Sequence, residues 1–378
     1  MGYVVVHYSE IGLKKGNREY FERLLVRNIQ KKLGVLAERV NRKYGYLLVE
    51  TDSLDEVCQK LSEVPGVAYS LKSSRAELDM DDFRTKSLNI LQNRDFNSFR
   101  VTTKRQNKSF PMTSMDVSRV LGEFIVNELD KEVDLEYPDV ELIVEIYGKY
   151  AYLSADRFEG IVGLPVDEEN KVVTLMSGGF DSPVAAYLMM KRGAKVILVH
   201  FQNYRLMKQS VEDKVEQLAN ALAKYQGSTI LYVIPFQEIQ EDIVTKCLAK
   251  VRMLVYRRVM LRISEKVMHK EKAKALVTGD NIFQVSSQTL ENLRAVYDAT
   301  EELVLTPLAG FNKMEIIKLS KEIGTFDISK LPYGDCCSFF IPEHPELRGS
   351  VEDLRREERK LDEGLWDKAL EKANRMVF

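Results

Sequence analysis

The residues best placed to do chemistry lie in one short segment, Ser177-Gly178-Gly179-Phe180-Asp181-Ser182. An apolar run, Val172–Met176, leads directly into it and is typical of a buried strand. Two adjacent glycines allow a tight turn in which backbone N–H groups can face an anion. Ser182 is a natural helix N-cap and Pro183 a natural first helical residue, so a helix dipole would point its positive end at the loop. We therefore expect phosphate or pyrophosphate to bind here.

The pattern of this segment separates it from other phosphate-binding loops. It is neither Gly-x-x-x-x-Gly-Lys-Ser/Thr nor Gly-x-Gly-x-x-Gly. Ser-Gly-Gly-x-Asp-Ser is the PP-loop pattern, and it resembles the ATP pyrophosphatases, which convert ATP to AMP and pyrophosphate. A glycine-rich turn without a ligand is the alternative interpretation. The segment 177–182 follows the first strand of a predicted parallel sheet, and this position favours the interpretation as a phosphate-binding loop.

The elements that must position this loop follow Lys171. Continuous apolar strands alternate with helices, which predicts a parallel α/β sheet covered on both faces. Ligands bind such sheets at the carboxyl ends of the strands. The expected strands are Val172–Met176, Lys195–Phe201, Thr229–Pro235 and Ala275–Thr278, and the expected helices are 183–192, 211–226, 238–270, 287–297 and a terminal helix, Val351–Ala373.

The first 165 residues have a different rhythm, typical of small α+β units. Alternating and helical patterns predict strand, helix, strand, helix within residues 1–60, and strand, helix, hairpin within 61–165. The expected elements are strands Val4–Tyr8, Tyr44–Glu50 and Phe99–Lys104, helices Asn17–Leu33, Leu54–Ser62 and Ser114–Leu129, and a hairpin of Glu141–Tyr147 with Tyr150–Ser154. The Thr113–Asp116 spacing predicts a capping box. We expect an inter-domain hinge at 160–165.

A resemblance to one family covers nearly the whole chain. Thr174–His200, Thr278–Asp280, Gln284–Thr289 and Pro332–Cys337 are similar to segments of the tRNA 4-thiouridine synthetases (ThiI family), as is the Gly12–Arg18 segment. The resemblance implies a ferredoxin-like domain at 1–60, a THUMP RNA-binding domain at 61–165 and a catalytic PP-loop domain at 171–378. It implies tRNA and ATP as substrates, with adenylation of a uridine 4-carbonyl, and raises a link to thiamine biosynthesis.

The resemblance also implies site residues. Asp181 would act catalytically and hold magnesium or orient phosphates, and Lys313 would neutralise charge near the reacting phosphate. For the arginine at the site we prefer Arg257 over Arg258. The implied ATP-binding residues are Leu175, Met176, Ser177, Gly178, Gly179, Asp181, Ser182, His200, Phe201, Arg257, Gly279 and Gln288. A core histidine and a surface lysine are the alternatives for His200 and Lys313.

Sulfur chemistry is expected at the adjacent pair Cys336-Cys337. The family's catalytic cysteine lies in the matching segment, and we favour Cys337. Burial is the alternative for a cysteine pair, but Pro332 and Gly334 indicate a loop, and loops present reactive groups. Many relatives end in a rhodanese domain that carries the persulfide, whereas this chain has no cysteine after Cys337. We therefore expect sulfur directly from a cysteine desulfurase or another persulfide donor. The resolving thiol stays open, because adjacent cysteines form strained disulfides.

Composition supports a globular chain with a polyanionic partner. The 378 residues are 45% hydrophobic and 30% charged with a net charge of −2, so indiscriminate coating of nucleic acid is not expected. Two local basic clusters nevertheless favour RNA. One is a helical stripe at four-residue steps, and the other is the predicted RNA contact in the THUMP-like region. The stripe is Arg258, Arg262, Lys266, Lys270 and Lys274, and the RNA contact is Arg100, Lys104, Arg105 and Lys108.

Several further expectations limit the alternatives. We expect no membrane span, no signal peptide, a cytoplasmic location and no zinc site, since no Cys-x-x-Cys is present. Of the four cysteines, Cys58 and Cys247 should be reduced core residues. A homodimer is compatible with the sequence. The competing functions are a PP-loop tRNA adenylase that adds an amine or makes another sulfur modification, and a non-catalytic THUMP RNA-binding protein. A methyltransferase is disfavoured because no Asn-Pro-Pro-Tyr-like motif is present.

Overall fold

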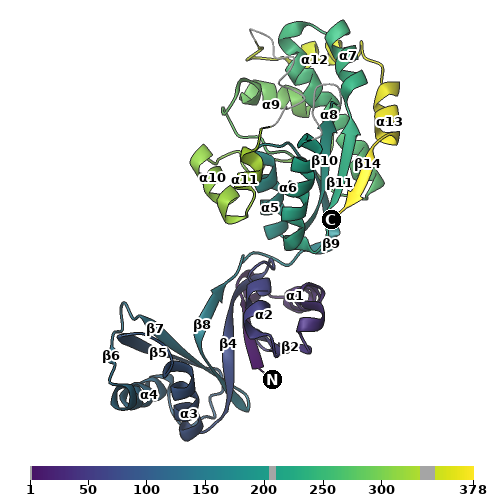
Figure 1. Ribbon diagram of the computed structural model, residues 1–378. Coiled ribbons are helices and arrows are strands. Elements are labelled where there is room, and N and C mark those ends of the chain that lie inside the picture. The colour runs from purple at the N-terminus through teal and green to yellow at the C-terminus, as the bar shows by residue number, and fades with distance from the viewer. Residues whose placement is uncertain (1, 204–209, 333–344) are drawn as a thin grey trace. The chain divides into compact units, whose positions relative to one another are not determined.

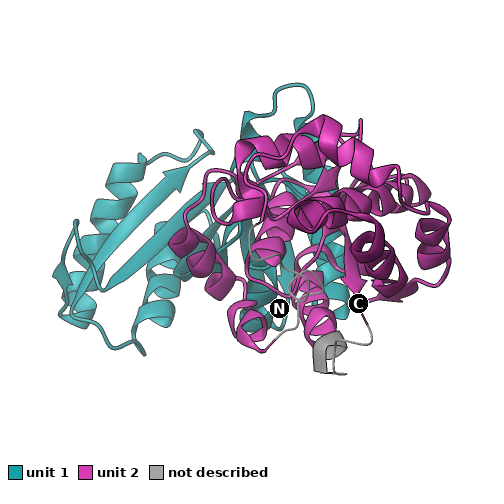
Figure 2. Ribbon diagram, turned by 90° about the horizontal axis from the view of Figure 1, so that it is seen from above, with its two compact units in different colours: residues 1–165 teal, residues 166–378 magenta. Residues whose placement is uncertain are grey.

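The chain divides after Pro165 into two units, 1–165 and 166–378, in a computed structural model that describes residues 2–203, 210–332 and 345–378 (Figures 1 and 2). Each unit has hydrophobic cores of its own. Within these ranges, no helix combines the length and apolarity needed to cross a bilayer.

Unit 1 is built on one eight-stranded sheet in the order β2-β3-β1-β4-β8-β7-β5-β6. Neighbouring strands are antiparallel except for β5, which is parallel to both β7 and β6. The strands are β1 (Gly2–Tyr8), β2 (Arg39–Lys43), β3 (Tyr46–Thr51), β4 (Val67–Glu77), β5 (Ser98–Arg105), β6 (Glu132–Val133), β7 (Val140–Tyr147) and β8 (Tyr150–Glu159). The helices are α1 (Arg18–Leu33), α2 (Leu54–Leu61), α3 (Met80–Leu91) and α4 (Ser114–Leu129).

Strand alternation gives this sheet two different faces. Val4 and Val6 pack into the core formed with α1 and α2, whereas Val5 lies on the opposite face in a tyrosine-rich cluster. The predicted hairpin is present as β7 and β8, and the predicted capping box holds α4, with Thr113 and Asp116 bonded reciprocally. The sequence patterns missed β2, α3 and β4. Because β4 pairs with β1 on one side and β8 on the other, it joins the two predicted N-terminal modules into one sheet.

Unit 2 contains the predicted parallel sheet, in the order β13-β12-β9-β10-β11-β14. All neighbours are parallel except the edge strand β14. Helices α5 and α6 cover one face, and α8 packs on the other with α7, α9 and the C-terminal helices (Figure 1). The strands are β9 (Asp167–Leu175), β10 (Ala194–Gln202), β11 (Ile230–Pro235), β12 (Leu276–Val277), β13 (Val304–Leu305) and β14 (Asn374–Val377). The helices are α5 (Asp181–Lys191), α6 (Ser210–Gln226), α7 (Gln237–Lys246), α8 (Arg252–Lys270), α9 (Leu290–Tyr297), α10 (Lys313–Glu322), α11 (Phe326–Lys330), α12 (Val351–Glu358) and α13 (Gly364–Glu371).

Two helix predictions in this unit are wrong. The helix expected over 238–270 is divided into α7 and α8, because the chain is extended at Cys247 and the Leu248 N–H donates to the Glu357 carboxylate at 2.9 Å. The single terminal helix expected over 351–373 is instead α12 and α13. Asp362 accepts the Gly364 N–H at 2.9 Å in the turn between them, and the chain then ends as β14 on the edge of the sheet.

Candidate active site

The predicted phosphate-binding loop connects β9 to α5 and is held by its own serines. The Ser177 N–H donates to Ser182 Oγ at 2.8 Å, and the Gly179 N–H donates to Ser177 Oγ at 3.3 Å. The prediction that Ser182 caps the helix and Pro183 begins it is wrong. Helix α5 begins one residue before Ser182, with Phe180 at the N-cap position and no side-chain cap. The Ser182 hydroxyl instead ties the start of the loop to the first turn of the helix.

Gly279 brings a second strand end against this loop. A Cβ atom at Gly279 would lie 2.9 Å from the Ser182 nitrogen and 3.1 Å from the Asp181 carbonyl carbon. Both atoms are backbone, so they cannot move aside as a flexible side chain would. Only glycine permits this approach, which closes the side of the site next to β12.

A cavity of about 320 Å³ opens between the loop and α8. This is the volume of a small-ligand site. The predicted residues that line it come mainly from strand ends, where a parallel sheet places ligands. They are Leu175, Met176, Ser177, Asp181, Ser182, His200, Phe201, Arg257, Gly279 and Gln288. Gly178 and Gly179 belong to the loop but are not among the wall residues of this cavity.

Part of the cavity wall was not predicted from the sequence. Met253, Met260 and Leu261 of α8 and Val296 of α9 provide an apolar side, suited to a flat ring rather than to phosphates. Their helical spacing is the signal that could have found them. That spacing is shared by every buried helix face, so it does not distinguish a cavity wall from a core.

A buried ion pair forms the polar side of the cavity. Arg257 is in contact with the Asp280 carboxylate and also donates to the Ser287 carbonyl at 3.0 Å. Asp280 further accepts the Tyr297 hydroxyl at 2.5 Å and the Gln288 amide at 3.1 Å. Asp280 belongs to the Thr278–Asp280 segment that carries the family resemblance, but it was not predicted as a site residue. Its role becomes visible only when its partners, distant in sequence, are placed around it.

The electrostatics of this pair keep Asp280 charged. Burial opposes ionisation of the carboxyl, but the Arg257 charge and the hydrogen bonds from Tyr297 and Gln288 outweigh it and hold the pKa of Asp280 below its usual value. Burial, reinforced by the neighbouring Asp280 charge, raises the pKa of the Tyr297 phenol. Tyr297 therefore stays protonated and remains a hydrogen-bond donor. The result is an arginine with a fixed orientation at the cavity wall.

The other predicted histidine and lysine positions are defined by contacts to the loop. His200 is buried, and its Nδ1 lies 2.9 Å from the Met176 carbonyl, so Nδ1 carries the proton. Lys313, the first residue of α10, donates to Asp181 Oδ1 at 3.0 Å. Gln284 donates to Asp181 Oδ2 at 3.0 Å. The carboxylate of Asp181 is thus held by two side chains from two later segments of the chain.

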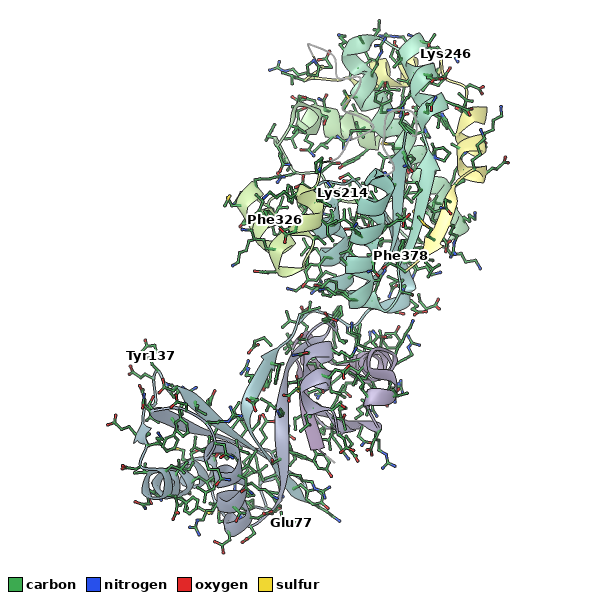
Figure 3. All side chains as sticks on the ribbon, in the orientation of Figure 1. Glu77, Tyr137, Lys214, Lys246, Phe326 and Phe378 are labelled. Atoms are coloured by element: carbon green, nitrogen blue, oxygen red, sulfur yellow. The ribbon has the colours of Figure 1, made fainter. Side chains whose placement is uncertain are left out.

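The predicted sulfur-transfer residues, Cys336 and Cys337, lie outside the described residues. The chain immediately before them is described, and it is attached to the loop. Ser329 Oγ donates to the Gly179 carbonyl at 3.2 Å. Buried Lys214 donates to the carbonyls of Ser329 and Leu331 at 2.9 and 2.8 Å, and burial lowers the pKa of this amine (Figure 3). These bonds fix the last described residues before the cysteines next to the phosphate-binding loop.

The two remaining cysteines are core residues, as predicted. Cys58 packs with α1 and α2, and Cys247 packs in the core beneath α8. Burial raises the pKa of each thiol to about 11. Neither carries appreciable thiolate near neutral pH, so neither is a nucleophile.

Three of the four predicted RNA contacts have internal partners. Arg100 donates to Glu141 at 2.8 Å, and Lys104 donates to the Tyr69 hydroxyl at 2.9 Å. Arg105 donates to the carbonyls of Phe110 and Met112. Lys108 is exposed. Arg105 therefore shapes the loop before α4, and Lys108 is the member of this cluster best placed to reach a phosphate.

Only part of the predicted basic stripe is a solvated cationic face: Lys270 at the end of α8 and Lys274 beyond it are exposed, whereas the first three members are paired with acidic residues. Arg258, its first member, is fully buried and is held by Glu358 at 2.6 Å and Asp298 at 3.2 Å. Arg262 also pairs with Glu358, and Lys266 pairs with Asp367 at 2.5 Å. The acidic partners come mainly from α12 and α13. The stripe attaches the C-terminal helices to α8, which the sequence pattern alone did not indicate.

Comparisons with known proteins identify the family of the chain. Residues 168–362 match the family model described as thiamine biosynthesis protein (ThiI), residues 3–70 match the ThiI ferredoxin-like domain, and residues 77–156 match the THUMP domain. A "Probable tRNA sulfurtransferase" of Thermoanaerobacter sp. (strain X514) is 38% identical over 362 residues, covering 95% of each chain. One of the same name from Clostridium perfringens (strain 13 / Type A) is 37% identical over 379 residues, covering 99% of this chain and 98% of its own.

Two solved structures have the same fold as this chain. The crystal structure of a 4-thiouridine synthetase–RNA complex with bound ATP is 33% identical, with a TM-score of 0.90 and full coverage of both chains. A Pyrococcus horikoshii Ot3 protein, 24% identical with a TM-score of 0.68, covers 86% of this chain and 100% of its own and shares the fold.

Proposed function

The chain belongs to the ThiI family and is a tRNA sulfurtransferase, and from that premise we propose that it uses ATP to convert a tRNA uridine, at position eight, to 4-thiouridine. The observation that carries this proposal is the cavity behind the Ser177–Ser182 loop, which gathers the predicted nucleotide-binding side chains around one loop. The related 4-thiouridine synthetase, which binds ATP and RNA, supports the same assignment.

The chemistry requires a better leaving group than the uridine oxygen. Transfer of AMP from ATP to the 4-carbonyl oxygen forms one O–P bond, breaks another and releases pyrophosphate. The loop N–H groups and the start of α5 would bind the phosphates, while the apolar side formed by Met253 and Met260 would receive the adenine. Arg257, oriented by Asp280, would contact phosphate oxygens.

Asp181 and Lys313 would act where charge changes during this transfer. Lys313 would stabilise the negative charge on the departing pyrophosphate. Asp181 offers one carboxylate, and Mg²⁺ commonly takes one or two protein carboxylates together with substrate phosphates and waters. These residues therefore fit a magnesium ion held mainly by ATP, which would neutralise phosphate charge when bound.

Sulfur would replace the activated oxygen in a second step. The terminal sulfur of a persulfide on Cys337 would bond to C4 of the base, and AMP would leave with the oxygen. A second thiol, or an external reductant, must then cleave the S–S bond to release the product. A cysteine desulfurase or another persulfide donor would reload the cysteine. The bonds from Ser329 and Lys214 support this assignment because they hold the preceding residues at the loop.

The test is mass spectrometry of nucleosides from tRNA incubated with the protein, ATP and a persulfide donor. We expect 4-thiouridine to form only when ATP is present and to be absent with Asp181→Ala. Cys337→Ser should release pyrophosphate in a tRNA-dependent single turnover but form no 4-thiouridine, and Cys336→Ser is its matched control. An amine adduct in place of sulfur would instead identify an amine-adding adenylase.

A further inference from the structure

Two exposed apolar residues are adjacent in sequence to the two residues whose side chains hold Asp181. Phe283, 66% exposed, directly precedes Gln284, and Met314, 71% exposed, directly follows Lys313. Gln284 and Lys313 are the two side chains that contact the Asp181 carboxylate. Two separate segments of the chain therefore each expose a large apolar residue directly next in sequence to a side chain that contacts Asp181.

The backbone holds Phe283 in an unfavourable conformation. Its φ angle is +62°, in the left-handed region that bulky residues rarely occupy. The Phe283 N–H donates to the Gln288 carbonyl at 3.0 Å, and the next residue, Gln284, is fixed to the phosphate-binding loop. Glycine would adopt this conformation without strain. Strain of this kind is concentrated at ligand-binding and catalytic positions, where it serves the site.

The apolar surface continues from these residues into the cavity. Val285 lines the cavity and is itself 52% exposed. Ile282, on the other side of Phe283, is 36% exposed. The segment 282–285 therefore exposes apolar side chains at three of its four positions and reaches the cavity wall at Val285. We call Ile282, Phe283, Val285 and Met314 the apolar rim.

We propose that Phe283 and Met314 hold the base of the uridine that is modified. The inference rests on the proposed function, in which Asp181 marks the position of the reacting phosphates. Uracil is flat and uncharged, and enzymes that modify a base commonly take it out of its stack and hold it between aromatic and apolar side chains. The Phe283 ring offers a stacking surface, and the flexible Met314 thioether adapts to a ring face.

The test measures pyrophosphate release that depends on tRNA, in a single turnover without a sulfur donor. Phe283→Gly should lower the apparent second-order rate constant for tRNA in this assay by roughly 5- to 150-fold, the range that loss of one stacked base gives, and Phe283→Tyr should stay close to the unsubstituted protein. Met314→Ala should also lower it. Leu303→Ala is the control. Leu303 is also apolar and is 59% exposed in the same unit, but it is not next in sequence to Gln284 or Lys313, the residues that donate to Asp181.

Two further readouts separate the explanations. ATP affinity without tRNA should be unchanged, and the Tm of Phe283→Gly should not fall, because glycine relieves the left-handed strain. An unchanged apparent second-order rate constant for tRNA in both Phe283→Gly and Met314→Ala overturns the inference. So does normal pyrophosphate release with loss of sulfur transfer from a protein donor alone, since the rim would then dock that donor. Failure of the proposed function itself would show as no tRNA-dependent release by the unsubstituted protein.

Discussion

Replacing Glu358 with glutamine should lower the free energy of unfolding of unit 2 more than the loss of a surface ion pair would. Glu358 lies at the end of α12, is nearly buried, and accepts from the fully buried Arg258 at 2.6 and 3.1 Å. Among the described residues, Arg258 has one other carboxylate partner, Asp298, at 3.2 Å. Arg262 also pairs with Glu358, but its side chain is 39% exposed and can be solvated when the pair is lost.

The expected loss of stability comes from the buried Arg258 charge, which Glu358→Gln leaves without its main partner. Removing one partner of a buried ion pair costs about 3–5 kcal/mol, because the other charge is left without compensation. Asp298 keeps part of that compensation for Arg258, so we expect a loss of about 3 kcal/mol for Glu358→Gln. Arg258→Met should cost less, about 2 kcal/mol, because Glu358 keeps Arg262 and Asp298 keeps Arg355.

The assay is urea unfolding followed by tryptophan fluorescence. Trp366, the single tryptophan of the chain, is buried in α13 and reports on the region that the network attaches. Asp367→Asn is the matched control; it breaks a pair whose side chains are 37% and 63% exposed, and should cost about 0–1 kcal/mol. If Glu358→Gln is no less stable than Asp367→Asn, the network does not attach the C-terminal helices in the way we describe.

Three other predictions concern the sites of both units. Asp280→Asn should weaken ATP binding. Because folding lowers the pKa of Asp280, the ionised carboxylate stabilises the folded state above about pH 3.8, and this contribution is lost as the pH falls further. The unfolding free energies of the unsubstituted protein and of Asp280→Asn, measured with urea, should therefore converge in acid. Iodoacetamide at pH 8 should leave Cys58 and Cys247 unlabelled in the folded protein, as peptide mass mapping would show, since burial raises both thiol pKa values to about 11. Lys108→Ala should reduce the salt slope of log tRNA affinity by roughly 0.7 to 0.9 without changing Tm, whereas Arg105→Ala should lower Tm because two loop carbonyls lose their donor.

The cavity was predictable from sequence because its residues are tied to strand ends. In a parallel sheet all strands finish at one edge, so residues just after an apolar run must converge there. Met176 and Phe201 each end such a run and Gly279 follows one, and all three line the cavity. The loop pattern supplied the remaining information, since Ser177 and Ser182 bond to each other across its turn.

Contacts made by residues distant in sequence were not predictable in this way. The pairing of Arg257 with Asp280, and of Asp181 with Gln284 and Lys313, joins segments whose relative placement depends on the whole sheet. Local pattern also misplaced the start of α5, because Ser182 has the composition of a cap. Its hydroxyl is used instead by the backbone of Ser177, a bond that no propensity encodes.

Helix α8 shows why neighbouring residues of one type can have unrelated roles. Arg257 and Arg258 are adjacent in sequence, so their side chains leave the helix about 100° apart. One reaches the cavity wall and Asp280, while the other is buried against α12. The next two stripe members, Arg262 and Lys266, pair with the C-terminal helices. Because these charges are neutralised within unit 2, a count of basic residues along α8 overstates what the helix offers to a polyanion. Exposed cations such as Lys108, which has no acidic partner within the described ranges 2–203, 210–332 and 345–378, are therefore the better guide to where RNA phosphates bind.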